Sequence, residues 1–125
     1  MRSASSTLRA LLVVSCTLLA ITSPIAQQKT VFTEQVYARI NSIYGTEAKE
    51  NVAKWRQLVT ELQSEDVDEK LYEINRFFNR FDFVDDLVHW HQKDYWATPI
   101  EFISTGAGDC EDYTIAKYFS LIELG

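Results

Sequence analysis

Apolar residues recur every three or four positions along most of the chain, the spacing that places side chains on one face of a helix. The first series runs from Phe32 to Tyr44, and Gly45 supplies a residue suited to a left-handed stop. The second runs from Thr46, a candidate cap, to Leu62, with lysines and glutamates on the opposite side. A polar stretch follows, so the pattern predicts two helices in succession.

A third series runs from Val67 to Phe81 and is rich in aromatic residues, with acidic side chains in its first turn. Residues 82–97 have a mixed pattern that we interpret as a short helix and a loop. The pair Thr98-Pro99 is a place where a helix normally stops.

The last apolar series follows a turn that contains Gly106 and Gly108, two residues that tolerate tight backbone. A helical rhythm then continues almost to the end of the chain. We therefore expect Asp109 or Cys110 to open a final helix, which makes the chain mostly α-helical.

Residues 1–26 have the pattern of a signal peptide. Arg2 and Arg9 precede the apolar run Leu11–Ile21, and no acidic residue interrupts the stretch. This run is shorter than the ~20 residues of a membrane span, so we place cleavage after Ala26 and one domain in residues 27–125. Lipidation at Cys16 is the less favoured alternative, because the apolar run continues past this residue.

The charge balance argues against a nucleic-acid partner. The chain has 12 basic and 18 acidic side chains, and loss of the signal arginines would make it more acidic still. Binding to nucleic acid needs a basic face that displaces counterions from phosphate. After cleavage Cys110 is the only thiol of an exported chain, which suggests a reactive thiol or an intermolecular bridge.

The chemistry concentrates in the segment Gly106–Tyr113, where Cys110 follows a glycine turn at a predicted helix start. Unpaired amides at a helix start favour a thiolate and can hold the oxyanion formed when it attacks a carbonyl. Asp109, Glu111 and Asp112 oppose thiolate formation by charge repulsion. A bound Ca²⁺ among these carboxylates would remove the conflict.

The sequence resembles the bacterial transglutaminase-like cysteine proteases of the LapG type. The resemblance rests on Asn75–Asn79, Asp94–Pro99, Gly108–Tyr113 and Ala116–Phe119, and it extends from about Phe32 to the end. It implies an α+β, papain-like or transglutaminase-like fold, of which this chain holds the helical N-terminal lobe and the nucleophile helix.

The resemblance also implies a function. Members are periplasmic, calcium-dependent endopeptidases that release large adhesins from the outer membrane and so control biofilm attachment. An inner-membrane receptor for cyclic di-GMP restrains them. Cys110 matches the family nucleophile, Asp109 and Glu111 match acids implicated in calcium binding, and Asp112 is a further candidate ligand.

The chain departs from the family in its last part. The family triad is completed by a His and an Asp downstream of the cysteine, whereas only 15 residues follow Cys110 and none is His. We therefore expect an incomplete domain without its antiparallel sheet, which is inactive as given, poorly stable and prone to aggregate. His89 and His91 precede Cys110, the reverse of the family order, and are weak substitutes.

Simpler interpretations stand beside these. Cys110 can be a buried hydrophobe, and the three acids can simply complement a helix dipole. Trp96 either shapes the wall of the active site or fills the core, and His89 and His91 are more typical of surface residues than of a metal site. The alternative functions are a non-catalytic helical interaction module and a calcium-binding fragment.

Overall fold

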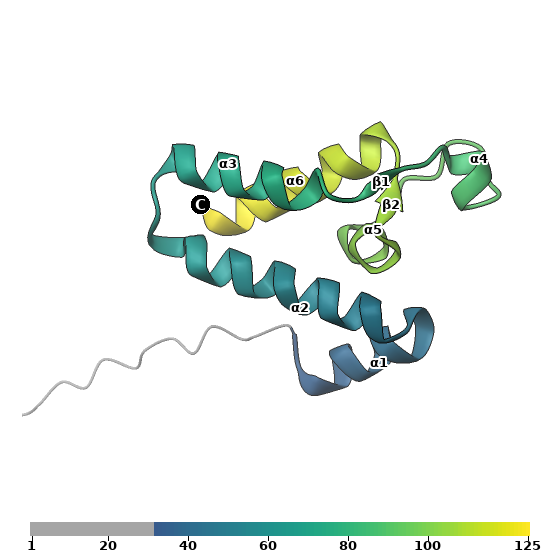
Figure 1. Cartoon of the computed structure of the whole chain (residues 1–125), viewed down its shortest axis with the longest axis horizontal. Coiled ribbons are helices and arrows are strands. Elements are labelled where there is room, and N and C mark those ends of the chain that lie inside the picture. Colours follow the sequence, from purple (N-terminus) through teal and green to yellow (C-terminus); the bar gives the residue numbers. More distant parts are fainter. Residues whose placement is uncertain (1–31) are drawn as a thin grey trace, which may run out of the picture.

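The computed structural model describes residues 32–125, so the expected signal peptide and Cys16 lie outside the described residues. The described part is mostly helical, as the apolar spacing predicts (Figure 1). Its elements in chain order are α1 (Glu34–Tyr44), α2 (Thr46–Glu61), η1 (Leu62–Ser64), α3 (Val67–Phe78), β1 (Asp82–Phe83), α4 (Asp86–His89), α5 (Pro99–Thr105), β2 (Ala107–Gly108) and α6 (Cys110–Leu124).

One glycine separates the first two helices. Gly45 has φ 94°, a value that favours glycine, and it both ends α1 and caps the start of α2. Thr46, expected as the cap, is instead the first residue of α2. The prediction placed the cap one residue too late, because Gly45 serves both helices.

The aromatic helix α3 is shorter than its pattern suggested. Asp66 caps its start by accepting the Glu69 N–H at 2.9 Å, but the helix ends at Phe78. Phe81 lies in the following turn, where its N–H donates to the Phe78 carbonyl at 3.0 Å. Its ring still packs on those of Phe77 and Phe78, with centroids 5.6 and 5.9 Å away.

The prediction that Thr98-Pro99 stops a helix is wrong, because this pair starts α5. Thr98 is the N-cap, Pro99 occupies the first turn, and Glu101 completes a capping box by accepting the Thr98 N–H at 2.8 Å. Proline is compatible with a helix start because the first amides of a helix have no carbonyl partner inside it.

Within residues 32–125 the strands are one two-residue parallel pair, β1 with β2, in which Asp82 aligns with Ala107 and Phe83 with Gly108. This pair fixes the chain just before α6 to the chain just after α3. The α+β, papain-like or transglutaminase-like fold as a whole stays a prediction.

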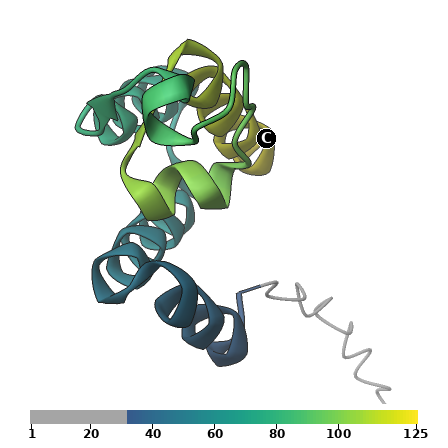
Figure 2. The same cartoon turned by 90° about the vertical axis from the view of Figure 1, so that its right-hand side faces the viewer.

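The core lies where α2, α3, α5 and α6 converge. In Figures 1 and 2, α5 packs between α2 and α6, and α6 runs beside α3. The largest fully buried side chains of the core include Phe78 and Phe102, whose rings stack with their centroids 5.9 Å apart. Trp55 of α2 donates from Nε1 to Ser120 Oγ of α6 at 2.9 Å, a buried hydrogen bond between the two helices.

One face of α6 stays uncovered among the described residues, where Tyr118, Phe119 and Ile122 are all more than half exposed. The expected tendency to aggregate is consistent with this surface and stays a prediction. None of the helices in residues 32–125 has the length and apolar character needed to cross a membrane.

Candidate functional site

Cys110 is the first residue of α6, and its side chain is exposed. The expectation that Asp109 or Cys110 opens the last helix is confirmed, and the interpretation of Cys110 as a buried hydrophobe is wrong. Because α6 starts at this residue, the thiol lies beside the first-turn amides, which have no carbonyl partner within the helix. Amides in this position can donate to an oxyanion that forms next to the thiol.

The turn before Cys110 requires glycine at position 108. A Cβ on Gly108 would lie 2.8 Å from Cδ2 of Phe102 and 2.9 Å from Cβ of Asp112. The approach of α5 and α6 to this residue leaves no room for a side chain. Gly108 therefore permits the close packing that holds the start of α6 in place.

Three carboxylates meet near the start of α6. Asp86 of α4, Asp109 and Glu111 each offer an oxygen atom, and these atoms lie within 4.8 Å of one another. We call these three residues the acidic site. Two of them, Asp109 and Glu111, are acids that the sequence singled out, and the third comes from a segment 23 residues earlier.

The donor set of the acidic site fits Ca²⁺. This ion binds oxygen at about 2.3–2.6 Å, so oxygen atoms on one ion are at most about 5 Å apart. Asp86 is only 5% exposed, and its Oδ1, like Oδ1 of Asp109, is buried without a hydrogen-bond partner. Buried carboxylate oxygens without partners are costly, and a cation at this position would satisfy them.

The electrostatics of the site indicate the same need for positive charge. Burial raises the pKa of Asp109 to about 6, and the adjacent Glu111 carboxylate and the negative charges of Asp86 and Asp112 add to the rise. Without a cation the site therefore holds a proton more tightly than an ordinary aspartate does.

Asp112, expected as a further metal ligand, is not part of the acidic site. It is 0% exposed, and its two oxygens accept backbone amides: Oδ1 that of Ala97 at 2.7 Å and Oδ2 that of Asp109 at 3.4 Å. Burial raises the pKa of Asp112, while these two hydrogen bonds act in the opposite direction. The geometry gives Asp112 a structural role, joining the first turn of α6 to the segment before α5.

The two histidines occupy different settings. His89 ends the short helix α4, and its Nε2 is buried without a partner, whereas His91 is exposed in a loop with φ 55°. Neither histidine lies on a strand, where residues two apart point to the same side and could bind one metal ion together. Neither is part of the acidic site.

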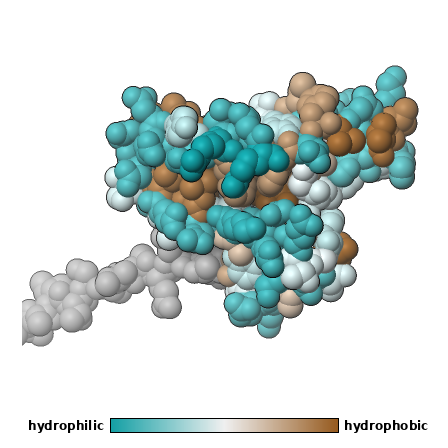
Figure 3. All heavy atoms as spheres, viewed as in Figure 1, coloured by the Kyte–Doolittle hydropathy of each residue, from teal (hydrophilic) through white to brown (hydrophobic). Residues whose placement is uncertain are grey.

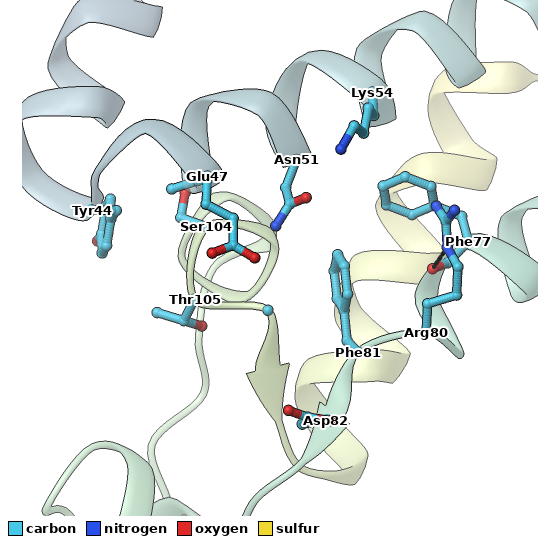
Figure 4. Close-up of a pocket in the computed structure, with 12 residues that line it drawn as sticks. Tyr44, Glu47, Asn51, Lys54, Phe77, Arg80, Phe81, Asp82, Ser104 and Thr105 are labelled. Carbon is cyan, nitrogen blue, oxygen red and sulfur yellow. Dashed lines mark hydrogen bonds between the residues drawn. The ribbon is translucent and has the colours of Figure 1, made fainter.

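A cavity of about 580 Å³ lies away from Cys110, between α2, the start of β1 and the end of α5 (Figure 4). Its lining carries both signs of charge, with Glu47 and Asp82 beside Lys54 and Arg80. Neither the thiol nor any residue of the acidic site lines it. The candidate site is instead the exposed surface around the start of α6.

Comparison with known proteins supports the resemblance. A search of curated protein sequences gives no significant match. The family model described as bacterial transglutaminase-like cysteine proteinase, BTLCP, matches residues 44–125.

Among solved structures, Legionella pneumophila LapG is 36% identical with a TM-score of 0.61, covering 74% of this chain and 50% of that one. Its calcium-bound form is 33% identical with a TM-score of 0.60, covering 75% of this chain and 52% of that one. The EGTA-treated form is 36% identical with a TM-score of 0.61, covering 74% and 49%. The chain thus spans about half the length of LapG. With a family model that matches most of its residues, the chain belongs to the bacterial transglutaminase-like cysteine proteinases.

Proposed function

We propose that this chain supplies the nucleophile and the calcium site of a periplasmic cysteine endopeptidase that releases large surface adhesins. The observation that carries the proposal is the exposed thiol of Cys110 at the start of α6, with Asp109 and Glu111 of the acidic site on either side of it in the sequence. An adhesin as substrate, a cyclic-di-GMP receptor as regulator and the periplasmic location come from the resemblance to LapG-type proteases.

In the proposed reaction the Cys110 thiolate attacks the scissile carbonyl, and first-turn amides of α6 stabilise the oxyanion. The acidic site would hold Ca²⁺, which supplies positive charge next to the turn. Asp86, Asp109 and Glu111 would bind the ion, and Asp112 would keep the turn in position through backbone amides. The calcium-bound LapG structure supports the choice of ion.

A chimera tests this proposal. Residues 44–125 replace the matched half of Legionella LapG, and cleavage of an adhesin fragment that LapG itself cuts is followed on gels. We expect cleavage in calcium that is lost in EGTA, in Cys110→Ser and in Asp86→Asn. Asp85→Asn is the matched control, because Asp85 neighbours Asp86 but is exposed and accepts the Leu87 N–H instead. If the folded chimera carrying Cys110→Ser cleaves the fragment as well as the unmodified chimera does, the proposal is contradicted.

The acidic site also favours a second candidate, a calcium-binding fragment without catalysis. Titration of the chain with Ca²⁺, followed by calorimetry, would then show binding that Asp86→Asn abolishes. If the chimera binds calcium but does not cleave, this second function replaces the first.

A further inference from the structure

Trp96 is an exposed tryptophan between two residues that are at least partly buried. Its side chain is 66% exposed, while Ala97 beside it is buried and Tyr95 is half-buried. The interpretation of Trp96 as core filling is therefore wrong. A large aromatic side chain that the fold leaves in solvent calls for another explanation.

The backbone on both sides of Trp96 is held by buried carboxylates. The Tyr95 N–H donates to Oδ2 of Asp86, and the Ala97 N–H donates to Oδ1 of Asp112 at 2.7 Å. Asp86 belongs to the acidic site, and Asp112 lies in the helical turn that Cys110 begins. Trp96 is thus fixed between the acidic site and the nucleophile turn.

The indole ring is held as well. Its Nε1 donates to Oδ1 of Asp94 at 3.1 Å, and Asp94 has φ 64°, a left-handed conformation unusual for a residue other than glycine. A side chain that is already ordered loses little conformational entropy when a ligand covers it. Exposed and ordered tryptophans are the typical anchors of binding surfaces.

Other apolar side chains, on β1 and α4, are exposed as well. Phe83 of β1 and Leu87 and Val88 of α4 are each more than 60% exposed. The backbone of β1 is paired with the Gly108 segment, two residues before Cys110, and Leu87 directly follows Asp86. Figure 3 shows apolar surface at the end of the molecule that carries α4.

We infer that Trp96 is a substrate-recognition residue, which receives an apolar side chain of the polypeptide close to the bond that Cys110 attacks. This inference rests on the proposed peptidase function and adds the chemistry of the substrate segment. The occupant is a polypeptide because the backbone on either side of Trp96 is hydrogen-bonded to Asp86 of the acidic site and to Asp112 of the helical turn that Cys110 begins. Trp96 acts in binding and leaves the reactivity of the thiol unchanged.

Alkylation of Cys110 in the full chain tests the inference without requiring proteolysis. Two reagents with the same electrophile are compared, iodoacetamide and N-(2-phenylethyl)iodoacetamide. In both, the Cys110 Sγ–carbon bond forms and iodide leaves. The second-order rate at Cys110 is followed by mass spectrometry of the peptide that contains it. The ratio of the two rates measures apolar recognition beside the thiol.

We expect the phenylethyl reagent to react about two- to ten-fold faster, the range that one aromatic contact contributes. Trp96→Ala should bring the ratio close to one, and Trp96→Phe should keep most of the preference. Tyr72→Ala is the matched control, since Tyr72 of α3 is similarly exposed at 61%, and it should leave the ratio unchanged.

A ratio of one in the natural chain, or the same ratio in Trp96→Ala, overturns the inference. Failure of the proposed function would give a different result from failure of this inference. The chimera would then show no Cys110-dependent cleavage, while the alkylation ratio of the natural chain would persist.

Discussion

At the scale of single residues, Asp112 illustrates how a buried acid can organise a site without touching substrate. Both of its oxygens accept backbone amides, one from the segment before α5 and one from the residue that precedes Cys110. Its side chain also lies against Gly108, where only a hydrogen fits. The carboxylate is thus the point at which the turn, α5 and α6 are held together.

Asp112→Asn should therefore be destabilising although it is nearly isosteric. The amide group has one acceptor oxygen and one donor nitrogen, so one of the two backbone N–H groups would face another donor. We expect the free energy of unfolding to fall by about 1–3 kcal/mol, the cost of a buried unsatisfied group. Urea denaturation followed by circular dichroism measures the loss.

Asp66→Asn is the control for this change. Asp66 also accepts a backbone amide, that of Glu69 at the start of α3, but it is exposed. Asparagine caps helices about as well as aspartate, so the loss should be only a few tenths of a kcal/mol. Equal small losses in the two variants would show that Asp112 does not hold the turn.

At the scale of elements, the start of α5 depends on one capping box. Thr98 Oγ1 accepts the Glu101 N–H at 3.3 Å, and Glu101 accepts the Thr98 N–H at 2.8 Å. Thr98→Ala removes the first bond and the hydroxyl contact with Glu101, so it should lower the free energy of unfolding by about 1 kcal/mol. The urea midpoint reports this shift.

Thr33→Ala is the matched variant for the cap. Thr33 precedes α1 in the same N-cap position, but its side chain makes no capping hydrogen bond. Its replacement should leave the urea midpoint nearly unchanged. A comparable shift in both variants would mean that α5 does not depend on its capping box.

The elements also show what local sequence can predict. The 3.6-residue period of apolar positions predicted the long helices correctly, because their apolar faces are continuous. The error at Pro99 arose because proline is compatible with both the end and the start of a helix. Thr98 and Glu101 three residues later already carried the start signal. The short pair β1–β2 gave no periodic signal, since two residues are too few.

At the scale of the whole molecule, the candidate site is part local and part long-range. Cys110, Asp109 and Glu111 are neighbours in sequence, so their proximity was predictable. Asp86 joins them only because the β1–β2 pair brings the start of α4 to the start of α6. The exposure of Trp96 could not be predicted from the sequence either, because it depends on hydrogen bonds of Tyr95 and Ala97 to residues distant in the sequence.

If Ca²⁺ binds the acidic site as proposed, this long-range geometry would make calcium a stabiliser of the whole fold. The acidic site exists only when α4 and α6 are in place, so an ion bound there favours the folded state by mass action. At calcium concentrations about 100 times the Kd, the gain should be about 3 kcal/mol. Thermal unfolding in calcium and in EGTA measures it, and Asp86→Asn should abolish the difference while Asp85→Asn retains it.

The calcium effect should depend on pH in a defined direction. The pKa of Asp109 is raised to about 6 in the folded chain, from an ordinary value of 3.8. Without calcium, protonation of Asp109 therefore favours the fold, a contribution fully present below about pH 4 and lost as pH rises through about 6. Calcium needs the ionised carboxylate, so its stabilising effect fades as pH falls below about 6. The Tm values in calcium and in EGTA should thus separate above pH 6 and converge toward pH 4. A difference between them that is constant over this range would show that calcium binds elsewhere than at the acidic site.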